Sequence, residues 1–102
     1  MRVIKPSRIH GFGQSFPDAK SSLNAWLKVT RKANWQGLMD VRATYPKADG
    51  VKVASGRTVT VFNIGGNKYR LIVAIHYNTA KVYVLRFMTH AGYDGEHWKR
   101  QL

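Results

Sequence analysis

The sequence predicts an α+β fold in which N-terminal helices pack on a mostly antiparallel β-sheet, with a short C-terminal helix. Two observations carry this prediction. Apolar residues recur at helical spacing before Tyr45-Pro46, and runs rich in β-branched residues follow that point. The chain has 102 residues and no linker or low-complexity tract, so residues 1–102 are expected to form a single domain.

The first half of the chain contains one strong predicted helix and two weaker ones. The strong helix spans residues 18–33, where Asp18 is placed to cap the free N–H groups. Its apolar side chains recur every three or four residues and form one stripe, which comprises Leu23, Trp26, Leu27, Thr30 and Ala33. Residues 5–16 could form a short helix despite two glycines, and residues 35–43 another, which Pro46 prevents from extending further.

The second half of the chain has the pattern of three strands joined by tight turns. Strand-like runs cover residues 57–64, 68–77 and 81–88, and GGN at 65–67 and NT at 78–79 separate them. Glycine accepts the positive φ that hairpin turns require. The three strands are therefore expected to form an antiparallel meander.

The charge of the chain is strongly unbalanced. Lys and Arg number 17 against 5 Asp and Glu, which gives a formal net charge of +12. Such a field attracts polyanions, so nucleic acid is the first expected partner, before an anionic membrane surface or an acidic protein. The absence of Cys excludes disulfides and thiolate chemistry. No apolar stretch approaches the ~20 residues of a membrane span and no signal-peptide pattern is present, so we expect a cytoplasmic location and no membrane partner.

The middle predicted strand carries an arginine among aliphatic residues. Alternation along residues 68–77 places Arg70 on the sheet face opposite the one that has the pattern of a core. Two interpretations stay open: its stem covers exposed apolar surface, or its guanidinium is presented to a phosphate. His90 and Tyr93 follow the next strand, which is expected to neighbour that of Arg70. Histidine can transfer a proton near neutral pH, and tyrosine can donate a hydrogen bond or stack on a base.

The carboxylates do not indicate a metal site. They are scattered along the chain at Asp18, Asp40, Asp49, Asp94 and Glu96, whereas a two-metal nuclease needs clustered carboxylates. Asp94 and Glu96, the one close pair, are expected to begin the short final helix. RNA cleavage without a metal could use Arg, Lys, His and Tyr side chains to move protons and offset charge. We therefore expect neither a metal nor another cofactor.

The stretch VFNIGGNKYRLIVAIHYNTAKVYVLRFMTHAGYD, residues 61–94, resembles the HigB-type toxins of the RelE superfamily. The runs VFNIGGNKYRLIV and MTHAGYD carry most of the match. The resemblance implies a RelE-like fold and a toxin of a type II toxin–antitoxin system, an mRNA interferase that inhibits translation. Such endoribonucleases usually cut mRNA in the ribosomal A site, through the 2′-OH and without a metal. It also implies a HigA-type antitoxin with a helix-turn-helix, so operator DNA is reached only through the toxin–antitoxin complex.

The same resemblance implies roles for individual residues. Arg70 in KYRLIV would contact the scissile phosphate. His90 and Tyr93 in THAGYD would transfer protons or hold the RNA. Lys68 is a weaker candidate for contact with the RNA backbone.

Two positions depart from the pattern of the relatives. They often carry the arginine of the third strand where this chain has Leu85, and here the arginine is Arg86. A shift of one residue moves a strand side chain to the opposite face, unless a bulge restores it. A two-residue loop at 78–79 would place Leu85 on the face of Arg70, so the substrate-binding role expected of Arg86 depends on the register. Gly92 stands where relatives often have Glu.

Binding without catalysis is the alternative function. A basic α+β domain with aromatic residues could occupy RNA, the ribosome or DNA and inhibit by occupancy alone. Lys52 and Arg57 lie outside the motif. They are candidates for contact with an RNA backbone, and the opposing interpretation is that they are solvated surface charges.

Overall fold

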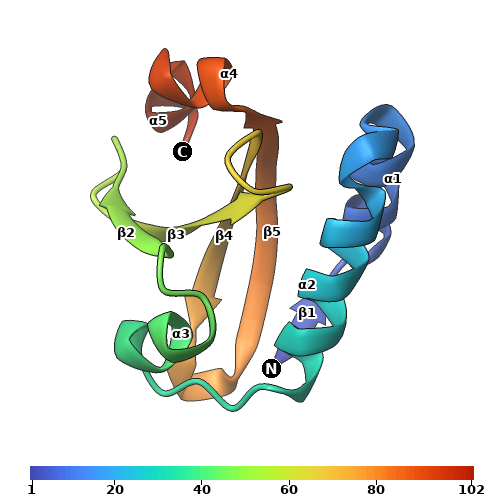
Figure 1. Ribbon diagram of the computed structural model, residues 1–102. Helices are drawn as coiled ribbons and strands as arrows, with labels where there is room; N and C mark the ends of the chain where they lie inside the picture. Colours follow the sequence, from blue (N-terminus) through green and yellow to red (C-terminus); the bar gives the residue numbers. More distant parts are fainter.

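Five strands form one sheet in the computed structural model, which describes residues 1–102 (Figure 1). The strands are β1 (Arg2–Ile4), β2 (Asp49–Lys52), β3 (Thr58–Ile64), β4 (Tyr69–His76) and β5 (Lys81–Thr89). The helices are α1 (Ser7–Ser15), α2 (Lys20–Lys32), α3 (Leu38–Thr44), α4 (His90–Asp94) and α5 (His97–Gln101), with short 3₁₀ turns at Pro17–Ala19 and Tyr77–Thr79. The sheet order is β1-β5-β4-β3-β2, and only the β1–β5 pair is parallel. The predicted α+β class and the antiparallel meander are confirmed.

The turns of the meander form where the sequence predicts them. Gly65 and Gly66 both have positive φ between β3 and β4, a conformation that costs glycine little. The next turn is longer than the predicted pair of residues, because the 3₁₀ turn runs to Thr79 and Ala80 adopts the left-handed conformation. Two strands were missed: β1 has 3 residues and β2 has 4, too few to show a period.

The N-terminal helices cover one face of the sheet. α1 and α2 lie together along it (Figure 1), and Val41 of α3 joins the same core of buried residues. Phe62 of β3 is fully buried at the centre of this core, where its ring contacts the rings of Trp26, Trp35 and Tyr45. Trp35 was expected at the start of the third helix, but it lies in the segment before α3 and is buried there.

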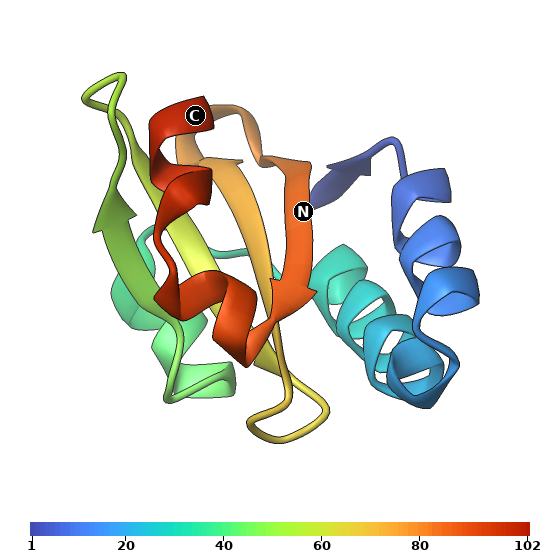
Figure 2. The same ribbon diagram turned by 90° about the horizontal axis from the view of Figure 1, so that it is seen from above.

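The C-terminal helices lie on the other face. Figure 2 shows α4 and α5 across the strands and apart from α1 and α2. Trp98 of α5 packs in a second cluster with Val53, Val59, Val61 and Ile72. The short final helix that the sequence predicts is two short helices, and they lie on the sheet face opposite α1 and α2. None of the helices is long and apolar enough to cross a membrane.

Asp18 does not cap the helix that follows it. The residue before α2 is Ala19, and no side chain caps that helix. Asp18 instead accepts a hydrogen bond of 2.7 Å from the hydroxyl of Tyr69 on β4. This bond holds the pKa of the Asp18 carboxyl below its usual range. The carboxylate therefore ties the start of α2 to the central strand, and the predicted capping role is wrong.

Replacement of Phe62 by alanine should destabilise the fold severely, because it leaves a cavity among three aromatic rings. We expect Phe62→Ala to lower the free energy of unfolding by about 3–5 kcal/mol in urea titrations. Met39→Ala is the control, since its side chain is 86% exposed, and it should change stability by about 0.5 kcal/mol or less. Equal effects of the two substitutions would contradict the placement of the core.

Stability should depend on the ionisation of Asp18 through Tyr69. A carboxylate whose pKa is lower in the folded state contributes stability above the unfolded pKa of about 3.9, and this is lost as the pH falls through the folded value. Tyr69→Phe removes the main cause of the lowered pKa. The difference in unfolding free energy from the unmodified protein should be largest at neutral pH and should shrink below about pH 4.

Tyr83→Phe is the matched control for that experiment, because the Tyr83 side chain makes no hydrogen bond. Its effect on stability should be the same at both ends of the pH range. A pH-independent effect of Tyr69→Phe would show that the charge of Asp18 contributes nothing.

Candidate functional site

Arg70 lies on the sheet face that α5 partly covers. It sits in β4 between Asn63 of β3 and Met88 of β5, and is only 8% exposed. Its Nη1 donates to the main-chain carbonyls of Asn67 and Tyr69 at 3.2 and 3.1 Å, and Nη2 donates to Asn67 Oδ1 at 2.7 Å. The turn before β4 therefore fixes the orientation of the guanidinium.

The guanidinium of Arg70 has no carboxylate partner. The four ion pairs of the protein all involve other residues, and the centroid of the Tyr93 ring lies 5.6 Å from Arg70 Cζ. Three of the five N–H donors of an arginine are used in the bonds to the β4 turn. A buried, uncompensated positive charge with free donors favours an anionic ligand at this point.

Tyr93 is held beside Arg70 by the final helix. Its ring stacks on Trp98 with centroids 5.2 Å apart and planes at 19°, and Trp98 Nε1 donates to the Tyr93 carbonyl at 3.1 Å. Trp98 is itself buried against the sheet. Burial, and then the charge of Asp49, raise the pKa of the Tyr93 phenol. The hydroxyl is therefore neutral near pH 7 and available as a hydrogen-bond donor.

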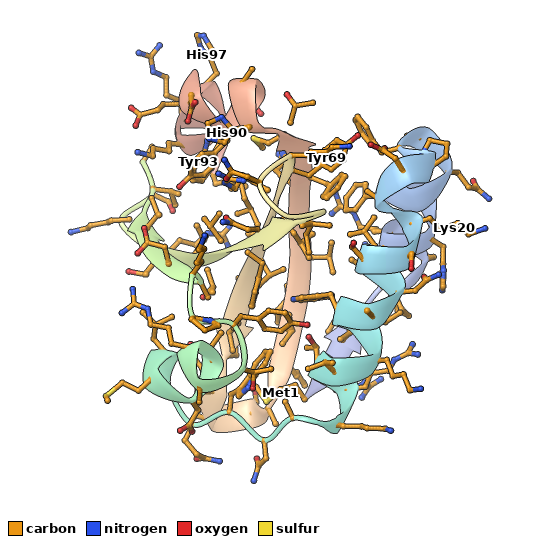
Figure 3. The ribbon with its side chains drawn as sticks, viewed as in Figure 1. Met1, Lys20, Tyr69, His90, Tyr93 and His97 are labelled. Atoms are coloured by element: carbon orange, nitrogen blue, oxygen red, sulfur yellow. The ribbon has the colours of Figure 1, made fainter.

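His90 begins α4 at the end of β5. The main-chain N–H of His90 donates to the main-chain carbonyl of Lys68 at 2.9 Å, and this bond fixes His90 next to the start of β4. The side chain of Thr89 caps α4 by accepting a bond of 3.1 Å from the Gly92 N–H. His90 and Tyr93 lie three residues apart on α4 and therefore on the same side of it (Figure 3).

Asp94 orients the imidazole of His90. Its Oδ2 lies 3.0 Å from His90 Nδ1, one helical turn away. The expectation that Asp94 begins the final helix is wrong, because it ends α4 and Glu96 precedes α5. Binding of Nδ1 by a carboxylate leaves Nε2 for a ligand. Sequence reasoning missed this residue, although a spacing of four from His90 within a helix was a signal for it.

A β-bulge places Arg86 on the face of Arg70. Ile72 pairs with Arg86 but Val73 pairs with Val84, so Leu85 is an extra residue in β5. The hairpin register at the turn would have set Leu85 opposite Ile72, as the sequence predicts for a regular strand. Because of the bulge, Arg86 is the residue opposite Ile72, and it is therefore a diagonal neighbour of Arg70 on the same sheet face. Residues in this diagonal relation are about 7–8 Å apart.

The other predicted binding residues lie outside this group. Lys68 Nζ is 3.7 Å from Asp18 Oδ2, at the start of α2. Lys52 is exposed at the end of β2, the outer strand of the sheet. Arg57 lines a shallow cavity of about 230 Å³ with residues of β4 and β5, which are Ala74, His76, Tyr83 and Leu85. Arg70 thus contacts Tyr93, His90 lies on the same helix as Tyr93, and Arg86 shares the sheet face of Arg70. No group of three His, Asp or Glu side chains could hold a metal ion.

Comparison with known proteins gives a consistent relationship over most of the chain. The family model of the HigB toxin, the RelE-like toxic component of a toxin–antitoxin system, matches residues 19–96. The chain is similar to the mRNA interferase toxin HigB of Escherichia coli (strain K12), with 27% identity over 94 residues that cover 92% of this chain and 88% of the relative. It is equally similar to the mRNA interferase HigB of Shigella flexneri. The mRNA interferase HigB of Escherichia coli O6:H1 is 22% identical over 94 residues, which cover 92% and 89% of the two chains.

The pKa of Tyr93 should fall when Trp98 is removed. Burial raises this pKa, so Trp98→Ala exposes the ring and should move the pKa down towards the ordinary value of about 10. NMR titration of the ¹³Cζ resonance of labelled tyrosines measures the change. Tyr45 is an internal control, because burial on the opposite face raises its pKa and this should persist in the variant. No change at Tyr93 would contradict the stacking on Trp98.

Proposed function

The chain belongs to the HigB family of RelE-like toxins, and we propose that it is an endoribonuclease that cleaves mRNA as the toxin of a type II toxin–antitoxin system. The names of its relatives as mRNA interferases support this proposal. The observation that carries it is the buried guanidinium of Arg70, which lies beside the Tyr93 ring without a carboxylate to neutralise it. A phosphodiester supplies the missing negative charge.

Cleavage proceeds by attack of the ribose 2′-oxygen on the adjacent phosphorus. The new bond joins O2′ to phosphorus while a base takes the proton of the 2′-OH. The bond from phosphorus to O5′ breaks, and O5′ receives a proton. The products are a 2′,3′-cyclic phosphate and a 5′-hydroxyl end, so neither a redox step nor a cofactor enters the balance.

The residues of the site divide this work. Arg70 and Arg86 offset the charge that develops on the phosphoryl oxygens, since fixed guanidinium donors stabilise such charge. His90, oriented by Asp94, transfers a proton through Nε2. Tyr93 is a neutral hydroxyl that donates to the RNA or stacks on a base, because its raised pKa prevents it from acting as a phenolate near pH 7.

The partners follow from the family and from the charge. The net charge of +12 draws the protein to RNA, and we infer that it acts on mRNA in the ribosomal A site. A HigA-type antitoxin with a helix-turn-helix would neutralise the toxin, and the toxin–antitoxin complex would bind operator DNA through the antitoxin. The antitoxin would have to occlude the face of Arg70 or prevent access to the ribosome.

Mapping of mRNA ends after brief induction in a bacterial host tests the proposal. We expect new 5′-hydroxyl ends within coding regions. They should be lost with His90→Ala, since removal of a general acid or base slows a reaction by about 10²–10⁴-fold. Arg70→Ala should slow cleavage by about 10²–10³-fold, the usual effect of one lost donor to an oxyanion.

His97→Ala is the matched control, because His97 is an exposed histidine of the neighbouring α5. It should leave both the growth arrest and the new ends unchanged. Growth arrest without new ends would favour the alternative function, inhibition by binding alone. Undiminished cleavage by His90→Ala and Arg70→Ala at equal expression would overturn the assignment of the site.

A further inference from the structure

The bulge in β5 lies where the strand loses its outer neighbour. β1 pairs with β5 only from Lys81 to Tyr83. From Val84 onwards the outer edge of β5 faces α1 and has no strand beside it. The carbonyls of Val84 and Leu85 on this edge therefore need another donor.

Arg8 of α1 supplies both bonds. Its Nη1 donates to the Val84 carbonyl and its Nη2 to the Leu85 carbonyl, each at 2.9 Å. Successive carbonyls of a regular strand point to opposite edges, as successive side chains point to opposite faces. The bulge turns two of them to the same side, and the planar fork of a guanidinium fits this pair.

The apolar pattern of β5 leaves the position of the extra residue open. Val84 and Phe87 both pack on the main core, so the two residues between them must share the opposite face. Either Leu85 or Arg86 could then be the unpaired residue. If it were Arg86, Leu85 would pair with Ile72, and the backbone of Arg86 would leave its register position diagonal to Arg70. In the structure Leu85 is the unpaired residue, and Arg8 bonds its carbonyl and that of Val84.

Arg86 is tied to the same carbonyl. Its Nη1 donates to the Leu85 carbonyl at 2.9 Å, the atom that also accepts from Arg8 Nη2. One carbonyl oxygen therefore connects a residue of α1 with a cation of the proposed site.

We propose that Arg8 is a positioning residue of the reaction, which fixes the bulge at Leu85 and thereby sets the position of Arg86 along the face of Arg70. This inference rests on the proposed function of that face. Arg8 has no assigned contact with RNA, since both of its Nη atoms donate to carbonyls of β5, whereas Arg86 uses only Nη1 in this way. Its removal displaces Arg86 and leaves the catalytic His90 in place.

A double-mutant cycle on cleavage by the purified toxin tests the inference. The substrate is mRNA bound to ribosomes, and the proteins are the unmodified chain, Arg8→Ala, Arg86→Ala and the double variant. Arg8→Ala should lower kcat by up to about 100-fold, as small misplacements of a catalytic group do, with little change in KM. In the Arg86→Ala background, Arg8→Ala should cause no further loss. A merely structural role would cost the same in both backgrounds, and such additive losses would overturn the proposal.

Two further variants separate geometry from charge. Arg31→Ala removes one positive charge from the exposed surface of α2, and its kcat should equal that of the unmodified protein. Arg8→Lys keeps the charge but cannot bridge two carbonyls as a fork does, so it should restore only a small part of kcat. Full restoration by lysine would show that only the charge matters and would overturn the proposal, as would unchanged cleavage by Arg86→Ala.

An NMR measurement keeps the inference separate from the proposed function. The Nε–Hε signal of Arg86 should shift in Arg8→Ala and stay unchanged in Arg31→Ala. If the unmodified protein cleaves no RNA, the proposed function fails, and this signal alone decides whether Arg8 positions Arg86. An unchanged signal would overturn the positioning in either case.

Discussion

The central strand β4 is buried on both of its faces, and this constraint shapes the rest of the molecule. Every residue from Tyr69 to Ala74 is shielded from solvent. The N-terminal helices cover only one face, so the C-terminal segment has to cross the other. Trp98 closes that face over Ile72, and in doing so it brings Tyr93 against Arg70. The packing of Trp98 that completes the second core cluster therefore also places Tyr93 beside Arg70 in the proposed site.

The site concentrates positive charge where the fold gives it no counter-ion. Arg70 is among the most buried polar residues, and its bonds go to carbonyl and amide oxygens of the preceding turn. Those dipoles orient the guanidinium without neutralising it. An uncompensated charge of this kind costs stability, and natural proteins accept such costs where a ligand repays them. Elsewhere, Asp18, Asp49 and Glu96 each pair with another cation, so these carboxylates do not neutralise Arg70.

Local signals identified most elements of the fold and the residues on which the proposed site rests. The apolar stripe of α2, the glycine turn before β4 and the alternation of side chains along β4 each depend on residues close in the sequence. The sequence predicted each of these three features. The motif THAGYD pointed to His90 and Tyr93, but it could not show that Asp94 binds the imidazole. The strands β1 and β2 were missed because strands of three or four residues are defined by their partners and not by a period of their own.

The sequence by itself determined the α+β class, the hairpins and the face of Arg70, because these follow from periodicity and from the backbone freedom of glycine. Only the tertiary structure decided whether Arg86 joins that face. The hairpin register alone would turn Arg86 to the opposite face, and the bulge in β5 brings it back. Arg8, which lies 76 and 77 residues away from Val84 and Leu85 in the sequence, donates to the two carbonyls at this bulge. The local sequence pattern of β5 cannot predict so distant a donor, because the two guanidinium bonds form only when α1 lies against the open edge of β5.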